Sequence, residues 1–287
     1  MGAILLNPIA ACFIQRNIVH KNTPPVILIF GPLDPTGASS LLADAVTFSH
    51  FGCHAVAAST ASLVRDSSMV EEVQPTSPEH LDDQARCLLE DMPIKAIKVG
   101  AVYSIETISI IAQIVADYSD LPLVLQPSSI PSESIADDID AEEAESALLE
   151  LLLPQTDIVI TKDYLLEHWQ AHGVLNTGIG ESPPQSLLSL GTKWVVSASK
   201  STHHAPGEYT LYGRRNLNKP IDLPLAVHNV LDAEGPLACA VTAAMAKGMD
   251  AESAAEAAAQ MVSKQMQTHF QAGMGKLFYN RSSNTTS

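Results

Sequence analysis

Three clusters of residues in this sequence combine side chains and backbone that suit a small-molecule site. The first is Asp34-Pro35-Thr36-Gly37, which follows an apolar run and precedes Asp44. The others are Lys98-Val99-Gly100 and a run of six residues that begins at Leu231. A carboxylate accepts hydrogen bonds from amino and hydroxyl groups, and glycine lets the backbone approach a ligand closely. Asp44 is therefore either a ligand-binding carboxylate or a helix residue bonded to a neighbouring N–H.

Two further polar groups are interpreted as solvated loops rather than metal sites. Six carboxylates gather just before a predicted helix: Asp137, Asp138, Asp140, Glu142, Glu143 and Glu145. The helix dipole favours carboxylates at a helix N-terminus, which explains this cluster without a cation. His203 and His204 are adjacent, but no further ligands follow at the spacing of a metal site. The sequence therefore assigns no metal ligand.

The elements that must position these clusters alternate between short β-branched runs and longer amphipathic stretches. The predicted strands are Val26–Gly31, Ala55–Ser59, Ala96–Gly100, Leu121–Pro127, Asp157–Thr161, Trp194–Ala198 and Glu208–Tyr212, the last as half of a meander. The predicted helices are Leu41–Phe51, Pro78–Asp91 with Ser77 as its N-cap, Ile105–Tyr118, Glu142–Leu152, Tyr164–His172, Leu237–Lys247 and Ala251–Phe270. This alternation predicts an α/β fold, in which a central, mostly parallel β-sheet is flanked by helices on both faces. Ligands of such sheets bind beyond the carboxyl ends of the strands.

Composition excludes several classes of function. The chain has 287 residues, of which 46% are hydrophobic and 17% charged, as in an ordinary soluble protein. Its net charge of −16 argues against a nucleic-acid partner, and a nucleotide site would have to supply positive charge locally. The four cysteines form no CxxC pair, so we expect reduced thiols and a cytoplasmic protein. No apolar run approaches the ~20 residues of a membrane span, so we expect no membrane partner.

The stretch from Asp34-Pro35-Thr36-Gly37 to Ala43-Asp44 resembles the first strand-loop-helix of a known kinase family. The hydroxymethylpyrimidine/phosphomethylpyrimidine kinases, members of the ribokinase-like superfamily, typically read D-P-S/T-G-G-A-G-x-Q-A-D there. Lys98-Val99-Gly100 is similar to the family's K-I/V-G, and the resemblance spans roughly residues 26 to 265. It implies a ribokinase-like fold, ATP and Mg²⁺ as cofactors, a small-molecule vitamin precursor as substrate, and a homodimer. We expect an N-terminal extension over residues 1–24, a single domain over 25–272 and a flexible tail over 273–287.

The resemblance also implies a substrate pocket. Its residues here are Asp44, Ser39, Leu63, Arg65 and Ala101. Arg65 stands where the family has a glutamate that holds the amino group of the ring. A guanidinium only donates hydrogen bonds, so Arg65 is either a solvated loop arginine or a group that attracts a carboxylate or phosphate. Ala101 replaces a methionine that packs on the ring, which predicts a looser pocket.

The positions that the family uses for the nucleotide are substituted in this chain. Asp163 stands at the asparagine of T-P-N, and Ala198 at a glycine of V-K-G-G. Glu234 lies in the last glycine-rich loop, where family members read H-G-T-G-C and related sugar kinases G-A-G-D. Gly235 occupies the cysteine or aspartate position, so the base is lost in register, although a register shift would place Asp232 in that role. Pro236 removes a backbone N–H that would face phosphate.

These substitutions predict a homologue of the ATP-dependent kinase of thiamine biosynthesis that is weak or inactive. The pyrimidine-side motif is partly kept, whereas the phosphoryl-transfer motifs are degraded. Two alternatives stay open. One is a non-catalytic small-molecule-binding or dimeric partner protein, that is, a pseudokinase, and the other is a kinase of a related vitamin such as pyridoxal. Whether the chain is an enzyme is left undecided by its sequence.

Overall fold

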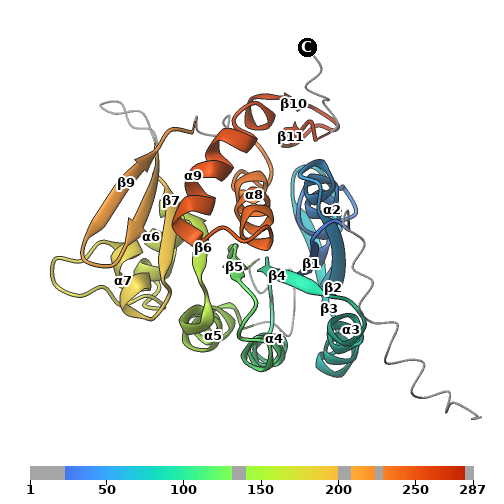
Figure 1. The fold of residues 1–287 in the computed structure, drawn as a ribbon, viewed down its shortest axis with the longest axis horizontal. Helices are drawn as coiled ribbons and strands as arrows, with labels where there is room; N and C mark the ends of the chain where they lie inside the picture. The colour runs from blue at the N-terminus through green and yellow to red at the C-terminus, as the bar shows by residue number, and fades with distance from the viewer. Residues whose placement is uncertain (1–22, 131–139, 200–207, 224–228, 282–287) are drawn as a thin grey trace, which may run out of the picture.

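A nine-stranded sheet forms the centre of the molecule (Figure 1). The computed structural model describes residues 23–130, 140–199, 208–223 and 229–281, so nearly all of the expected N-terminal extension lies outside it. Strand order is β3-β2-β1-β4-β5-β6-β7-β8-β9. The strands span Val26–Leu33 (β1), His54–Arg65 (β2), Val70–Pro75 (β3), Ile94–Val99 (β4), Leu123–Leu125 (β5), Ile158–Lys162 (β6), Trp194–Ala198 (β7), Tyr209–Gly213 (β8) and Leu217–Ile221 (β9).

Six neighbouring strands, from β2 to β7, run parallel. The antiparallel strand β3 closes one edge, and the antiparallel pair β8–β9 closes the other. The predicted mostly parallel sheet is therefore confirmed, as is the meander. Because the parallel strands share one direction, their carboxyl ends meet along one edge of the sheet.

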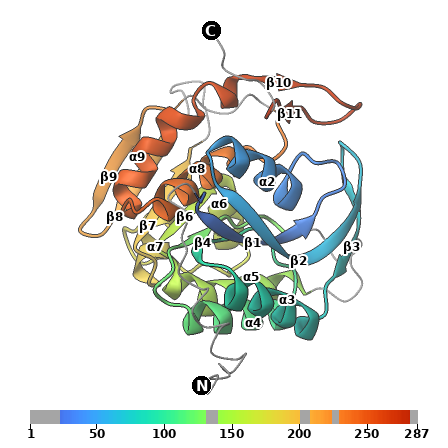
Figure 2. The same ribbon diagram turned by 45° about the vertical axis from the view of Figure 1, so that its right-hand side comes forward.

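Helices cover both faces of the sheet (Figures 1 and 2). On one face lie α3 (Pro78–Asp91), α4 (Ile105–Asp117) and α5 (Ala141–Ala147), and on the other α2 (Ser40–His50), α8 (Gly235–Ala246) and α9 (Ala251–Val262). Helices α6 (Asp163–Ala171) and α7 (Pro183–Ser189) complete the first layer beside β6 and β7. Alternate residues of β1 enter the two cores, Leu28 and Phe30 on the α3 side and Ile27 and Ile29 on the α8 side.

Several elements differ in extent from the prediction. Helix α3 begins as expected, with the Ser77 hydroxyl accepting from the His80 N–H at 3.3 Å. Strand β2 continues to Arg65 because β3, which the sequence analysis did not predict, pairs with its second half. Helix α7, which the sequence analysis did not predict, begins at Pro183, and the Ser182 N–H donates to the Gln185 side chain at 3.0 Å. None of the described helices is long and apolar enough to cross a bilayer.

The C-terminal segment, residues 264–281, packs on the rest of the fold. Its strand β10 (His269–Phe270) pairs with β11 (Phe278–Tyr279). The Gly275 N–H donates to Ser67 Oγ at 3.0 Å, 208 residues earlier, and the Lys276 N–H donates to the Ser67 carbonyl at 2.8 Å. Residues 273–281, which the sequence analysis assigned to a flexible tail, therefore make contacts with the rest of the fold. The remaining residues, 282–287, lie outside the described part of the chain.

Candidate functional site

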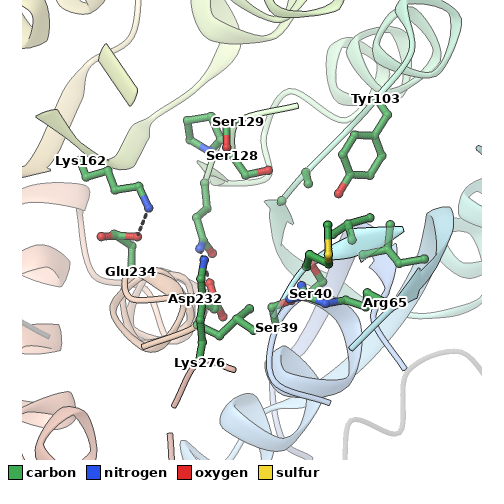
Figure 3. Close-up of a pocket in the computed structure, with 18 of the residues that line it drawn as sticks. Ser39, Ser40, Arg65, Tyr103, Ser128, Ser129, Lys162, Asp232, Glu234 and Lys276 are labelled. Atoms are coloured by element: carbon green, nitrogen blue, oxygen red, sulfur yellow. Dashed lines mark hydrogen bonds and ion pairs between the residues drawn. The ribbon is translucent and has the colours of Figure 1, made fainter. Parts of the chain in front are cut away.

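A cavity of about 280 Å³ opens at the carboxyl ends of the parallel strands (Figure 3). Its walls come from the start of α2, the end of β2, the loops after β4 and β5, the end of β6 and the start of α8. Four of the predicted substrate-binding residues line it: Ser39, Leu63, Arg65 and Ala101. The site therefore lies where open α/β sheets bind their ligands.

Asp44, the fifth predicted substrate residue, lies behind the cavity wall. Its side chain is buried, with one oxygen 2.6 Å from the Lys98 ammonium and the other 3.0 Å from the Cys239 thiol. Burial, the largest single cause, acts to lower the pKa of Lys98, but Asp44, Cys239 and Asp232 together outweigh it, so the net shift is upward and the ammonium stays charged. Lys98 lines the cavity. Asp44 therefore pairs with a cation of the site and does not itself line the cavity, and its role in substrate binding stays a prediction.

Arg65 is held at the cavity by the buried carboxylate of Asp34. That carboxylate accepts hydrogen bonds from the Thr36 N–H at 2.9 Å, the Thr36 hydroxyl at 2.7 Å and the Ser39 hydroxyl at 2.5 Å. One guanidinium nitrogen of Arg65 lies 3.6 Å from it, and the Arg65 side chain is 9% exposed. Arg65 is thus a buried wall residue and not a solvated loop arginine.

Asp232 occupies the space at the start of α8 that a side chain on residue 235 would fill. A Cβ added to Gly235 would lie 1.9 Å from Asp232 Oδ2. The carboxylate accepts a hydrogen bond from the Gln126 amide at 2.8 Å and pairs with Arg281 at 3.3 Å. Burial, the largest cause, raises the pKa of Asp232, although Arg281 opposes the shift. Gly235 itself carries no reacting group, so Asp232 is the acid–base candidate here.

The predicted nucleotide positions are only partly brought to the cavity. Glu234 lines it, and its carboxylate lies 3.6 Å from the Lys162 ammonium (Figure 3). Burial raises the pKa of Glu234, and Lys162 acts against that shift. Asp163 begins α6 and accepts a hydrogen bond from the Ser197 hydroxyl, whereas Ala198 ends β7. Asp163 and Ala198 therefore lie at the ends of the neighbouring strands β6 and β7, but neither residue lines the cavity.

Three residues of the site were missed in the sequence. Tyr103 follows β4 and lies in the wall, where the rule about carboxyl ends would have found it. Lys276 also lines the cavity, and Arg281 pairs with Asp232. Both residues lie in the segment predicted to be a flexible tail. No local sequence pattern indicates that this segment contacts Ser67 and Asp232, which come much earlier in the chain.

The family model described as phosphomethylpyrimidine kinase matches residues 34–280. The chain belongs to the phosphomethylpyrimidine kinase family. A hydroxymethylpyrimidine/phosphomethylpyrimidine kinase of Aquifex aeolicus is 31% identical over 186 residues, which cover 65% of this chain and 71% of the relative. Another from Streptomyces coelicolor is 25% identical over 257 residues, covering 88% and 93%.

The solved structures confirm the ribokinase-like fold of this phosphomethylpyrimidine kinase family member. An ADP complex of Bacillus subtilis pyridoxal kinase matches with a TM-score of 0.75 at 20% identity, over 91% of this chain and 98% of the other. Membership in a kinase family implies ATP as the phosphate donor. The first turn of α8 contains Pro236, and the Asp232 and Glu234 carboxylates lie at its start.

Proposed function

We propose that this chain binds a small heteroaromatic vitamin precursor in the cavity and phosphorylates it slowly or not at all. The position of the Asp232 carboxylate, over the first turn of α8, carries the proposal. That volume belongs to the reacting side chain in the family pattern, and the first turn of this helix is where its backbone N–H groups would face phosphate.

The donors of that first turn support the same conclusion. The Gly235 N–H is bonded to the Asp232 carbonyl at 3.2 Å, and Pro236 has no N–H. The Glu234 side chain adds a second carboxylate beside them. The negative charge of these carboxylates disfavours a terminal phosphate at this turn. Losing one hydrogen-bond donor to the transferring group costs about 100-fold in rate. Lys162 offsets the charge of Glu234 but supplies no donor at Asp232.

A second candidate is an active kinase of hydroxymethylpyrimidine, its phosphate or pyridoxal, with Asp232 as a relocated base. Its support is that Asp232 lines the cavity and carries a raised pKa, which favours proton transfer near neutral pH. Mg²⁺, a homodimer and a cytoplasmic location are implied by family resemblance for either candidate, and they remain expectations.

An ADP-release assay separates the two candidates. We expect turnover of hydroxymethylpyrimidine, its phosphate and pyridoxal to stay below about 1% of that of the Aquifex aeolicus relative under the same conditions, since at least one donor is missing. Thermal-shift measurements with the same compounds should nevertheless show binding. Turnover close to that of the relative would favour the second candidate, and the lack of any thermal shift would remove the binding proposal.

A further inference from the structure

Basic residues gather at the cavity although the chain as a whole is strongly acidic. Four basic residues line it, Arg65, Lys98, Lys162 and Lys276, against the two carboxylates of Asp232 and Glu234. The chain as a whole carries a net charge of −16, so the overall composition does not explain why basic side chains gather at this cavity. Lys162 pairs with Glu234 at one end, Lys98 with the buried Asp44, and Arg65 with the buried Asp34. Arg65 and Lys276 are the two cations at the other end of the cavity.

The end of the cavity between α2 and β2 presents several donors. Ser39 and Ser40 line it at the start of α2, where the Ser39 hydroxyl donates to Asp34 and makes no side-chain cap. The first-turn N–H groups of this 11-residue helix therefore receive no cap from Ser39, and the positive end of the helix lies at the cavity wall. The Arg65 guanidinium lies beside them, held by Asp34 at 3.6 Å.

Tyr103 contributes a further donor at this end. Its side chain is buried, at 6% exposure, and its hydroxyl points into the cavity (Figure 3). No hydrogen bond joins this hydroxyl to another of the described residues, and a hydroxyl that faces a cavity can donate to a ligand bound there. Because burial raises the pKa of Tyr103, the hydroxyl stays protonated and can donate.

The C-terminal segment brings the second cation. Lys276 reaches the cavity because its own N–H and that of Gly275 bond to Ser67, two residues after Arg65. The turn at Ser67 is itself fixed, since Asp66 accepts from the N–H groups of Ser68 and Met69 at 2.6 and 2.9 Å. No ion pair of Lys276 is found among the residues that the structure describes.

We propose that this end of the cavity binds the carboxylate or phosphate of a heteroaromatic ligand. The inference rests on the proposed function and narrows its ligand class from neutral aminopyrimidines to anionic rings. A guanidinium, ammonium, hydroxyl and helix N-terminus can all donate to such an anion, and of these groups only the hydroxyl could also accept from a ring amino group. Leu63, Met69 and Val70 line the same end and supply apolar contacts for the ring.

This anion subsite is separate from the end where a nucleotide phosphate would lie. Arg65 ends β2 and Lys162 ends β6, and three strands stand between them in the sheet. Four strand spacings amount to about 19 Å, which is longer than a single phosphate or carboxylate can bridge. Figure 3 shows the two groups on opposite sides of the cavity.

Isothermal titration calorimetry at one moderate ionic strength tests the subsite with pyridoxine, pyridoxine 5′-phosphate and 4-pyridoxate. These probes share a ring and differ in the anion, and none carries an aldehyde that would react with lysine. We expect at least one anionic probe to bind about tenfold or more tightly than pyridoxine, and the preferred anion distinguishes phosphate from carboxylate. Arg65→Gln should remove most of that preference, with a smaller loss in Lys276→Gln and Tyr103→Phe.

Pyridoxine serves as the reference ligand in each variant, because its affinity should fall less than that of the preferred anion. Arg214→Gln, on the exposed turn between β8 and β9, is the matched control and should leave all three affinities unchanged. Equal binding of pyridoxine and both anions would overturn the inference while leaving the proposed function intact. An equal loss for all probes in Arg65→Gln would overturn it too. If no probe binds although hydroxymethylpyrimidine does, the subsite is wrong and the proposed function stands.

Discussion

Asp232 is the residue on which the two candidate functions depend. Its backbone is in the left-handed region, with φ of 58°, and its side chain turns back over the start of α8. Gly235 is compatible with this arrangement because any larger residue would collide with the carboxylate. The same group therefore either excludes a phosphate from the helix N-terminus or accepts a proton from a substrate hydroxyl. These two roles respond in opposite directions to the loss of its charge.

Asp232→Asn is the variant that distinguishes the roles. If the carboxylate repels phosphate, removing its charge should raise the affinity for ATP by about tenfold, a change of about 1.4 kcal/mol, without creating a base. If Asp232 is a base, the variant should lose at least about 100-fold in turnover while ATP affinity changes little. Calorimetry with ATP and the ADP-release assay measure the two quantities.

Asp222→Asn is the matched control for this comparison, because Asp222 is exposed just after β9. It should change neither ATP affinity nor turnover beyond a factor of about two, since isolated surface charges contribute little. An Asp232→Asn protein with unchanged ATP affinity and unchanged turnover would contradict both roles.

At the level of elements, the sequence predicted the helices and strands whose capping residues or hydrophobic pattern lie within the element itself. Ser77 caps α3 because a serine precedes a proline and an amphipathic run, and Trp194–Ala198 is a β-branched run of strand length. The sequence did not predict β3 or the second half of β2. Each of these two segments is a strand because it pairs with the other, and the composition of neither one indicates that pairing. Helix α9 ends at Val262, eight residues before the predicted end, because the chain turns there to reach β10.

The contact between the C-terminal segment and the β2–β3 turn gives a prediction at this level. A Cβ on Gly275 would lie 2.4 Å from the carbonyl carbon of Ser67, which is backbone and cannot rotate away. Gly275→Ala should therefore displace the segment and lower the free energy of unfolding by about 1–3 kcal/mol in urea denaturation. It should also weaken the anion preference that Lys276 supports.

Met274→Ala is the control in the same segment, because Met274 is 99% exposed. Its free energy of unfolding should change by less than about 0.5 kcal/mol. A Gly275→Ala protein as stable as the wild type would show that the segment does not dock on Ser67 as described.

At the level of the whole molecule, the site is assembled from both ends of the chain. Residues after β1 and β2 form one side of the cavity, and the segment after α9 returns to contribute Lys276 and Arg281. A family resemblance that ends near residue 265 could not place these groups, since their partners lie about 50 and 200 residues away in sequence. The sequence therefore predicted the sheet and the location of the site but not how its charges are balanced.

Two truncations test this dependence on the C-terminal segment. Removing residues 273–287 should cost about 3–5 kcal/mol in the free energy of unfolding, because Asp232 would lose Arg281, its partner in an ion pair whose side chains are 8% and 7% exposed. Removing residues 282–287 alone should cost less than about 0.5 kcal/mol, since every described contact of the segment is kept. Chemical denaturation compares the two proteins with the full chain. A stable protein that ends at residue 272 would mean that the domain closes before the segment, and that Asp232 does not need Arg281 to remain buried.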